Sequence, residues 1–210
     1  MTDQTRGGEL YPTITPYKTD YLSVSGHQIY YELSGNPDGP AALFLHGGPG
    51  GGTSARDRCF FNPDHYRIVL MDQRGSGKSK PNASYDYEGA LFNNSTNYLI
   101  EDIELLRAEL SLDHWQLILG GSWGSTLAVA YAEKHPKQCR QILLRGVFTA
   151  LPDEIDALFQ DGTTANHYPE EWEKYVTYIE KTSQNWNLEK QNLLAAYQKR
   201  LFDPDQRLEA

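Results

Sequence analysis

The sequence is poor in cysteine, with Cys59 and Cys139 the only two among its 210 residues. Two distant cysteines are too few for a disulfide framework and too far apart for a zinc knuckle, so we expect free, buried thiols. No apolar stretch approaches the roughly 20 residues that span a bilayer. Residues 1–17 lack the apolar run of a signal peptide. These absences argue against disulfide-rich secreted and membrane-spanning proteins and predict a cytoplasmic location.

Basic residues are also scarce, with 19 Lys and Arg against 28 Asp and Glu, which gives a net charge of −9. The basic residues are scattered and form no polybasic segment. Binding to nucleic-acid phosphates needs basic stripes, so nucleic acid is not an expected partner. The pattern predicts neither a membrane partner nor a metal site, and it does not indicate an oligomeric state.

Six segments are predicted to be strands. The first two alternate polar and apolar residues, as strands with one solvated face do. The other four contain unbroken apolar runs, which are typical of parallel strands buried on both faces. These segments are residues 21–26 and 27–35, followed by 41–48, 66–75, 115–124 and 141–148.

Helical spacing of apolar residues predicts helices over 95–113 and 123–135, between the later strands. Two antiparallel strands followed by β-α-β units indicate an α/β fold with a mostly parallel sheet. From about residue 149 only helical patterns follow, separated by Gly162 and Pro169. We therefore predict two parts, a core over residues 1–148 and a partial helical insertion over residues 149–210.

The glycine-rich stretch HGGPGGG (46–52) directly follows a predicted buried strand. A dinucleotide-binding fingerprint would need glycine at position 53 and a phosphate-binding loop would need lysine there, but Thr53 occupies it. Glycines also let backbone N–H groups approach a developing negative charge, so we interpret the stretch as an oxyanion loop. A plain flexible loop is the alternative.

A second glycine-rich stretch, GSGKS (75–79), resembles the end of a phosphate-binding loop. That motif needs glycine at position 72, where Asp72 stands, so no nucleotide or other cofactor is predicted. We expect Asp72 and Arg74 to organise a turn beside the site, in a structural role.

The segment GGSWGS (120–125) matches G-x-S-x-G, the pattern of a nucleophilic serine on a sharp strand-to-helix turn. A predicted strand precedes it and a helix rich in small residues follows it. This context makes Ser122 a candidate nucleophile for acyl transfer.

With HGGPGGG, DQRGSGKS and GGSWGSTLA in this order, the sequence resembles the proline iminopeptidases (prolyl aminopeptidases). These are serine peptidases of the α/β-hydrolase fold that release N-terminal proline from peptides. The resemblance implies an α/β-hydrolase core with a helical cap, and Ser122 as nucleophile. It also implies oxyanion donors in the backbone N–H groups of Gly48 and Trp123, and peptides with N-terminal proline as substrates.

The same resemblance suggests residues that contact the substrate. Phe148 matches a position where the family lines its proline pocket with an aromatic ring, although an ordinary core role is equally compatible. Leu158 and Phe159 fall where family members carry tyrosines. Because Leu158 lacks the hydroxyl, a strict preference for proline stays open.

The chain offers no clear base for Ser122. The α/β-hydrolase order is Ser, then Asp or Glu, then His, and only His135 and His167 follow Ser122. His135 is expected at a helix end and His167 in the helical insertion, and His46 belongs to the oxyanion loop. We therefore expect the acid, the histidine and the last strands beyond Ala210, with this chain as the N-terminal portion of the enzyme.

Two other interpretations remain open from the sequence alone. The chain could be a non-catalytic remnant or an interaction protein, since a shortened sheet would expose an unpaired edge. It could also be another α/β-hydrolase, acting on esters or amides.

Overall fold

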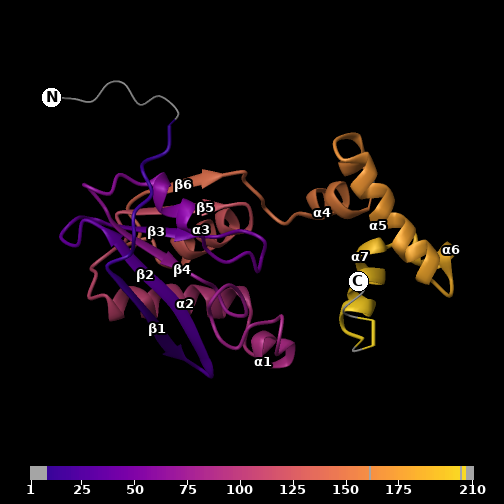
Figure 1. The fold of residues 1–210 in the computed structure, drawn as a ribbon, viewed down its shortest axis with the longest axis horizontal. Coiled ribbons are helices and arrows are strands. Elements are labelled where there is room, and N and C mark those ends of the chain that lie inside the picture. The colour runs from indigo at the N-terminus through magenta and orange to yellow at the C-terminus, as the bar shows by residue number, and fades with distance from the viewer. Residues whose placement is uncertain (1–8, 161, 204, 207–210) are drawn as a thin grey trace. The chain divides into compact units, whose positions relative to one another are not determined.

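The computed structural model describes residues 9–160, 162–203 and 205–206. The chain forms two compact units, Met1–Phe148 and Thr149–Ala210, drawn in Figure 1. The boundary lies where the strand pattern of the sequence gives way to helical patterns. The assignment of these units as catalytic core and cap stays a prediction. The predicted lack of a signal peptide falls partly on residues 1–8, outside the described residues.

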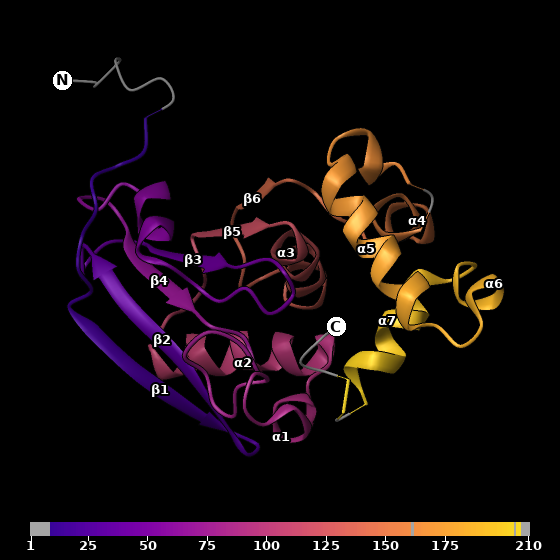
Figure 2. The same cartoon turned by 45° about the vertical axis from the view of Figure 1, so that its right-hand side comes forward.

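The first unit is built on a six-stranded sheet with the order β1-β2-β4-β3-β5-β6. β1 and β2 form an antiparallel hairpin, β2 is antiparallel to β4, and the remaining neighbours are parallel. The hairpin is the long pair of strands in Figure 2. The predicted α/β fold with a mostly parallel sheet is confirmed. The strands are β1 (Lys18–Val24), β2 (His27–Gly35), β3 (Ala41–Leu45), β4 (Arg67–Met71), β5 (Leu117–Gly121) and β6 (Ile142–Arg145).

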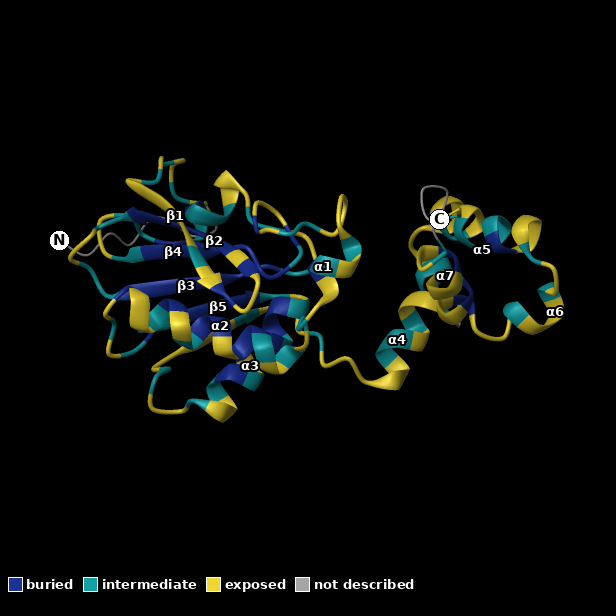
Figure 3. Cartoon of the chain, turned by 90° about the horizontal axis from the view of Figure 1, so that it is seen from below, coloured by how far each residue is buried: buried dark blue, intermediate teal, exposed yellow. Residues whose placement is uncertain are grey.

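Both faces of the central strands are covered, because unbroken apolar runs place hydrophobic side chains on each face of a strand. Helices α2 (Thr96–Glu109) and α3 (Trp123–Lys134) contact each other and share one core cluster with the sheet. A second cluster, which includes Phe44 and Phe61, lies beside the short helix η1 (Ala55–Phe60). The dark strands β3 and β4 in Figure 3 show this burial.

Strand β6 differs from the prediction that it would be buried on both faces. It lies at the edge of the sheet and pairs with β5 alone among the described residues. Ile142 and Leu143 are 42% and 48% exposed. An apolar run indicates that a segment can be buried, but actual burial needs neighbouring elements, which the described residues do not supply on this side.

The second unit is helical throughout its described part, as the sequence predicts. A small core around Ile179 and Leu193 holds its helices together, and the parallel rings of Tyr175 and Tyr197 stack with centroids 4.5 Å apart. The helices are α4 (Pro152–Phe159), η2 (Thr164–Asn166), α5 (Pro169–Thr182), α6 (Trp186–Glu189) and α7 (Leu193–Leu201). The remaining helix of the chain, α1 (Tyr87–Leu91), belongs to the first unit.

Three sequence expectations bear on the class of protein. Both cysteines are free, but only Cys59 is buried, and Cys139 is half-buried. No helix in the described part of the chain is long and apolar enough to cross a membrane. Among the same residues, no group of three or more His, Cys, Asp or Glu side chains is arranged to hold a metal ion.

Candidate active site

Ser122 occupies the single residue between β5, which ends at Gly121, and α3, which begins at Trp123. Its φ of 52° and ψ of −122° lie in a region that residues with a side chain rarely adopt. Such a conformation costs on the order of 1–3 kcal/mol, and the surrounding structure must hold it in place. The result is an exposed serine on a sharp strand-to-helix turn.

The two glycines of G-x-S-x-G allow this turn because three backbone segments meet there. A Cβ added to Gly120 would overlap the carbonyl oxygen of Gly124, and one added to Gly124 would overlap that of Leu45 on the neighbouring strand. By contrast, a Cβ on Gly121 would meet nothing nearer than 4.0 Å. The motif therefore needs glycine at its first and last positions for backbone packing.

We expect Gly124→Ala to lower the free energy of unfolding by at least about 3 kcal/mol, because the new methyl group collides with the backbone of β3. Gly121→Ala, in the same segment but with open space around it, should change that free energy by less than about 0.5 kcal/mol. Urea unfolding followed by circular dichroism compares the two variants. Equal effects at the two positions would contradict this account of the elbow.

The loop HGGPGGG lies directly against Ser122, the candidate nucleophile. A Cβ on Gly47 would lie 3.0 Å from the Cβ of Ser122 and 3.6 Å from its Oγ. Gly48 has a φ of +118°, a conformation that glycine adopts readily. Within the described residues the backbone N–H groups of Gly48 and Trp123 have no acceptor. These groups are thus available to a ligand at Ser122.

His46 fixes the loop at its first residue. His46 Nε2 lies 3.0 Å from the backbone nitrogen of Gln73, and Nδ1 lies 2.9 Å from the Gly47 carbonyl oxygen and 3.2 Å from the backbone nitrogen of Gly52. Burial lowers the pKa of His46 below its ordinary value, which favours the neutral ring. With both nitrogens engaged, His46 has a structural role and leaves no lone pair for the proton of Ser122.

Gln73 joins the loop to the elbow, a role that the sequence alone does not predict. Its side-chain amide donates to the His46 carbonyl over 2.8 Å, and its Oε1 accepts from the indole Nε1 of Trp123 over 3.0 Å. One buried side chain thereby holds both segments that carry the candidate oxyanion donors. The sequence feature that points to Gln73 is its position in DQRG, directly after a buried strand.

Asp72 and Arg74 organise the turn after β4. Asp72 is fully buried and accepts hydrogen bonds from the backbone N–H groups of Thr53 over 2.6 Å and Lys78 over 2.8 Å, so it ties the oxyanion loop to the GSGKS turn. Arg74 makes a bidentate ion pair with Asp102 of α2, at 2.6 and 2.7 Å, and both side chains are almost inaccessible to solvent. Both residues thus have the structural role that we expect from the sequence.

A cavity of about 440 Å³ opens at Ser122. Its wall comes from both glycine-containing segments and from Arg145 and Gly146 at the end of β6. The backbone N–H of Ser122 donates to the Arg145 carbonyl over 2.9 Å, so the elbow is anchored to this edge strand. The site therefore lies at the carboxyl ends of the parallel strands, where ligands bind in open α/β sheets.

No histidine is in position to act on Ser122 among the described residues. No histidine ring of the described residues forms a hydrogen bond with the Ser122 hydroxyl. His135 is the C-cap residue of α3, the helix end that we expect, and its ring lies 5.2 Å from that of Tyr131. His167 is the C-cap of η2 in the second unit.

The comparisons with known proteins agree with this geometry. Residues 40–204 match the model of a family described as the alpha/beta hydrolase fold. The chain belongs to the alpha/beta hydrolase fold family. A probable proline iminopeptidase from Leptolyngbya boryana is 45% identical over 94% of this chain, and a proline iminopeptidase from Arabidopsis thaliana is 46% identical over 93%. The predicted resemblance to proline iminopeptidases is confirmed.

The likeness extends to a solved structure and has a clear limit in length. The crystal structure of VinJ aligns with 89% of this chain, with a TM-score of 0.61 and 17% sequence identity, and the alignment covers 62% of the VinJ chain. This likeness concerns the fold alone. The chain spans 57% of the length of the Leptolyngbya relative and 48% of the Arabidopsis one. The chain thus spans about half the length of each of these relatives.

The predicted substrate-contacting residues lie in both units of the chain. Phe148, at the end of the first unit, is half-buried, and its backbone N–H donates to Ser125 Oγ over 3.0 Å. Leu158 and Phe159 end helix α4 and are 45% and 38% exposed. Their contact with a substrate stays a prediction.

Proposed function

We propose that this chain carries the nucleophile and oxyanion site of a prolyl aminopeptidase. Ser122 Oγ attacks the carbonyl carbon of an N-terminal proline, and the oxyanion accepts hydrogen bonds from the N–H groups of Gly48 and Trp123. The C–N bond then breaks, the leaving peptide amine takes up the proton that Ser122 released, and water hydrolyses the prolyl ester to free proline.

The observation that carries the proposal is the positive φ of 52° at Ser122, together with the glycine loop packed against it. This turn exposes the Ser122 hydroxyl at the carboxyl end of β5. The side chain of Gln73 connects the two segments that bear the N–H donors by hydrogen bonds. Donors fixed before the reaction stabilise a developing charge without the cost of reorganisation. The names of the curated relatives supply the proline preference.

The proposal also requires a general base and an acid, because a serine hydroxyl is a weak nucleophile at neutral pH. His46 is engaged on both ring nitrogens, and the other described histidines do not reach Ser122. We therefore assign the base and the acid to polypeptide that corresponds to the part of the relatives outside this match. The free cysteines support a cytoplasmic location.

A second cleft, on the Trp123 side of the loop, has room for the leaving peptide. Its volume is about 480 Å³, and its walls include the apolar side chains of Leu91, Leu99 and Trp123. Leu91 is 48% exposed, so the cleft presents apolar surface to solvent. Trp123, which follows Ser122 in the chain, lines this cleft.

The experiment that tests the proposal compares the activity of the native protein on a prolyl amide and on a simple ester, each of which carries a naphthyl group. Proline β-naphthylamide should be hydrolysed with release of free proline, whereas β-naphthyl acetate should be a poor substrate. The intact mass of the native protein, measured in the same preparation, shows whether further polypeptide accompanies the 210 residues. Faster turnover of the ester without release of proline would favour an esterase and contradict the proposal.

A further inference from the structure

Ser125, the last residue of the GGSWGS segment, is a buried serine that the proposed reaction does not use. It lies on the first turn of α3 and is 1% exposed. Its Oγ donates to the carbonyl oxygen of Ser122 over 2.6 Å and accepts from the backbone N–H of Phe148 over 3.0 Å. One hydroxyl therefore connects the elbow to the segment that follows β6.

The carbonyl that Ser125 contacts belongs to the peptide group of a candidate oxyanion donor. The Ser122 carbonyl and the Trp123 N–H are the two ends of one planar peptide, so fixing the carbonyl also fixes the direction of the N–H. The backbone N–H of Ser125 donates to the same carbonyl over 2.8 Å, so that oxygen has two donors from one residue. Because the Trp123 N–H has no acceptor within the described part of the chain, the bonds at the carbonyl end orient this peptide.

The side chain of Trp123 is fixed as well, because its indole Nε1 donates to Gln73 Oε1 over 3.0 Å. Gln73 thus holds the indole, and Ser125 holds the peptide that carries the N–H. Hydrogen-bonded groups polarise one another, so the bond from the Ser125 hydroxyl to the carbonyl also strengthens the N–H at the other end of the peptide as a donor. The Ser125 hydroxyl therefore acts on both the direction and the strength of this donor.

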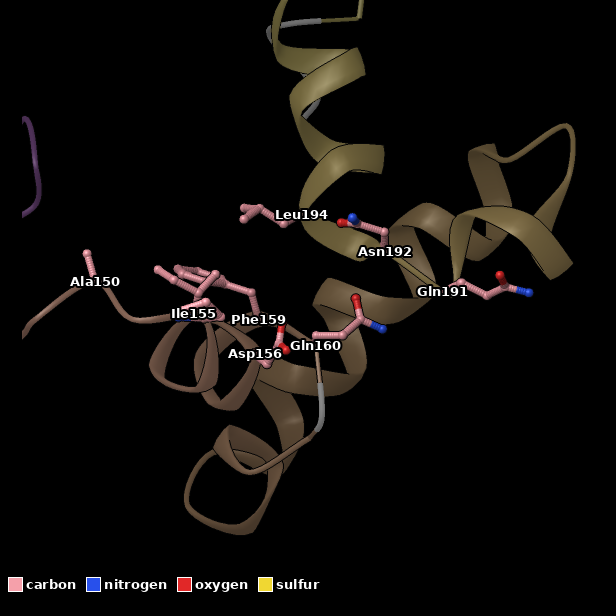
Figure 4. A pocket seen from close by; sticks show the side chains of 9 residues that line it. Ala150, Ile155, Asp156, Phe159, Gln160, Gln191, Asn192 and Leu194 are labelled. Carbon is pink, nitrogen blue, oxygen red and sulfur yellow. The ribbon is translucent and has the colours of Figure 1, made fainter. Parts of the chain in front are cut away.

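The segment after β6 depends on the same turn of α3. Gly146 is exposed and has a φ of +55°, and a Cβ added there would meet no atom within 4 Å, so packing does not fix its position. Instead, the N–H of Phe148 donates to Ser125, and the carbonyl of Phe148 accepts from Thr126 Oγ1. Phe148 ends the first unit, and the chain continues past Ala150 into the second unit, part of which is drawn close up in Figure 4.

We propose that Ser125 is a positioning residue for acyl transfer. Its hydroxyl orients the Trp123 N–H for the developing oxyanion and holds Phe148 beside the elbow, without acting on the reacting atoms itself. The proposal rests on the proposed function, since Trp123 supplies an oxyanion donor in that reaction. A hydroxyl that only stabilised the start of α3 would affect folding and leave the rate of the reaction unchanged.

Ser125→Ala should lower the kcat of the native protein for proline β-naphthylamide about tenfold or more, because a misdirected N–H stabilises the oxyanion less. KM should rise less than about threefold, since this interaction acts mainly in the transition state. The matched control is Ser34→Ala, because Ser34 is a fully buried serine of β2 whose hydroxyl has no partner among the described residues. This control should change kcat less than about twofold.

NMR spectroscopy of the whole chain gives a readout that does not depend on catalysis. In Ser125→Ala the carbonyl carbon signal of Ser122 and the amide nitrogen signal of Trp123 should shift, because the peptide between them loses a hydrogen bond. The N–H of Phe148 should exchange with solvent at least about tenfold faster, because it loses its acceptor. Ser34→Ala should leave these signals unchanged.

Thermal melting establishes which variants fold. If Ser125→Ala does not fold, Ser125→Cys takes its place, because a thiol is a weaker hydrogen-bond donor and acceptor than a hydroxyl. The cysteine variant should lose at least about threefold in kcat. A folded variant whose kcat stays within about twofold of the unmodified protein, or whose defect lies in KM alone, would overturn the inference.

The reaction of Ser122 with a fluorophosphonate separates this inference from the proposed function, because the reagent needs the nucleophile and no prolyl group. Suppose that the native protein releases no proline, yet Ser125→Ala slows this labelling at least about fivefold. The aminopeptidase is then refuted and the role of Ser125 is supported. If Ser125→Ala leaves both proline release and labelling unchanged, the role of Ser125 is refuted and the aminopeptidase stands.

Discussion

Ser122→Ala should reduce the release of proline by the native protein at least about 10³-fold in kcat, because no ester intermediate can then form. Alanine retains the Cβ of serine, so the strained turn and the adjacent N–H donors keep their positions. The loss should therefore appear in kcat, with little change in the thermal midpoint. Initial rates with proline β-naphthylamide over a range of concentrations separate kcat from KM.

Two controls make this result specific. Ser23→Ala removes the hydroxyl of an exposed serine on β1, far from the elbow in the sheet order, and should leave kcat unchanged. Modification of the native protein by a fluorophosphonate should add one label, located on Ser122 by peptide mass analysis, and Ser122→Ala should add none. A variant that keeps most of its activity would exclude Ser122 as the nucleophile.

Arg74→Met should lower the free energy of unfolding by about 3–5 kcal/mol, because it leaves the Asp102 carboxylate buried without its partner. The pair is bidentate, its two side chains are 2% and 0% exposed, and Arg74 also donates to the Asn93 carbonyl over 2.9 Å. Urea unfolding of the chain measures this loss directly and does not depend on any activity.

A double variant and a surface pair test the cause of that loss. Arg74→Met combined with Asp102→Leu removes both charges, and we expect it to recover at least about half of the lost stability. Lys18→Met breaks an ion pair whose side chains are 45% and 51% exposed, and it should cost no more than about 1 kcal/mol. If Arg74→Met costs no more than Lys18→Met, the buried pair is not a major source of stability.

The sequence predicts the parts of this site that are local in the chain. Ser122 and its two glycines lie within five residues, and the crowding that requires glycine there arises from the turn itself and from the adjacent strand. The alternating and unbroken apolar patterns likewise predict the order of strands, because side-chain period and burial are local properties.

The partners that complete the site are separated in sequence, and no local pattern predicts them. Gln73 contacts Trp123 from 50 residues away, and Arg74 finds Asp102 on a helix 28 residues further along the chain. The burial of β6 was predicted wrongly for the same reason, since it depends on what lies beside the strand and not on its own composition.

The hydrogen bond from the Ser122 N–H to Arg145 has a mechanical consequence. Ser122 is thereby attached to an edge strand of the sheet, and local opening in proteins starts preferentially at segments with few buried contacts. Fraying of β6 would release the backbone that enforces the unusual φ of Ser122, and the turn could then relax. The backbone conformation of Ser122 therefore depends on edge strand β6. A segment that pairs along β6 would stabilise the position of the Ser122 hydroxyl.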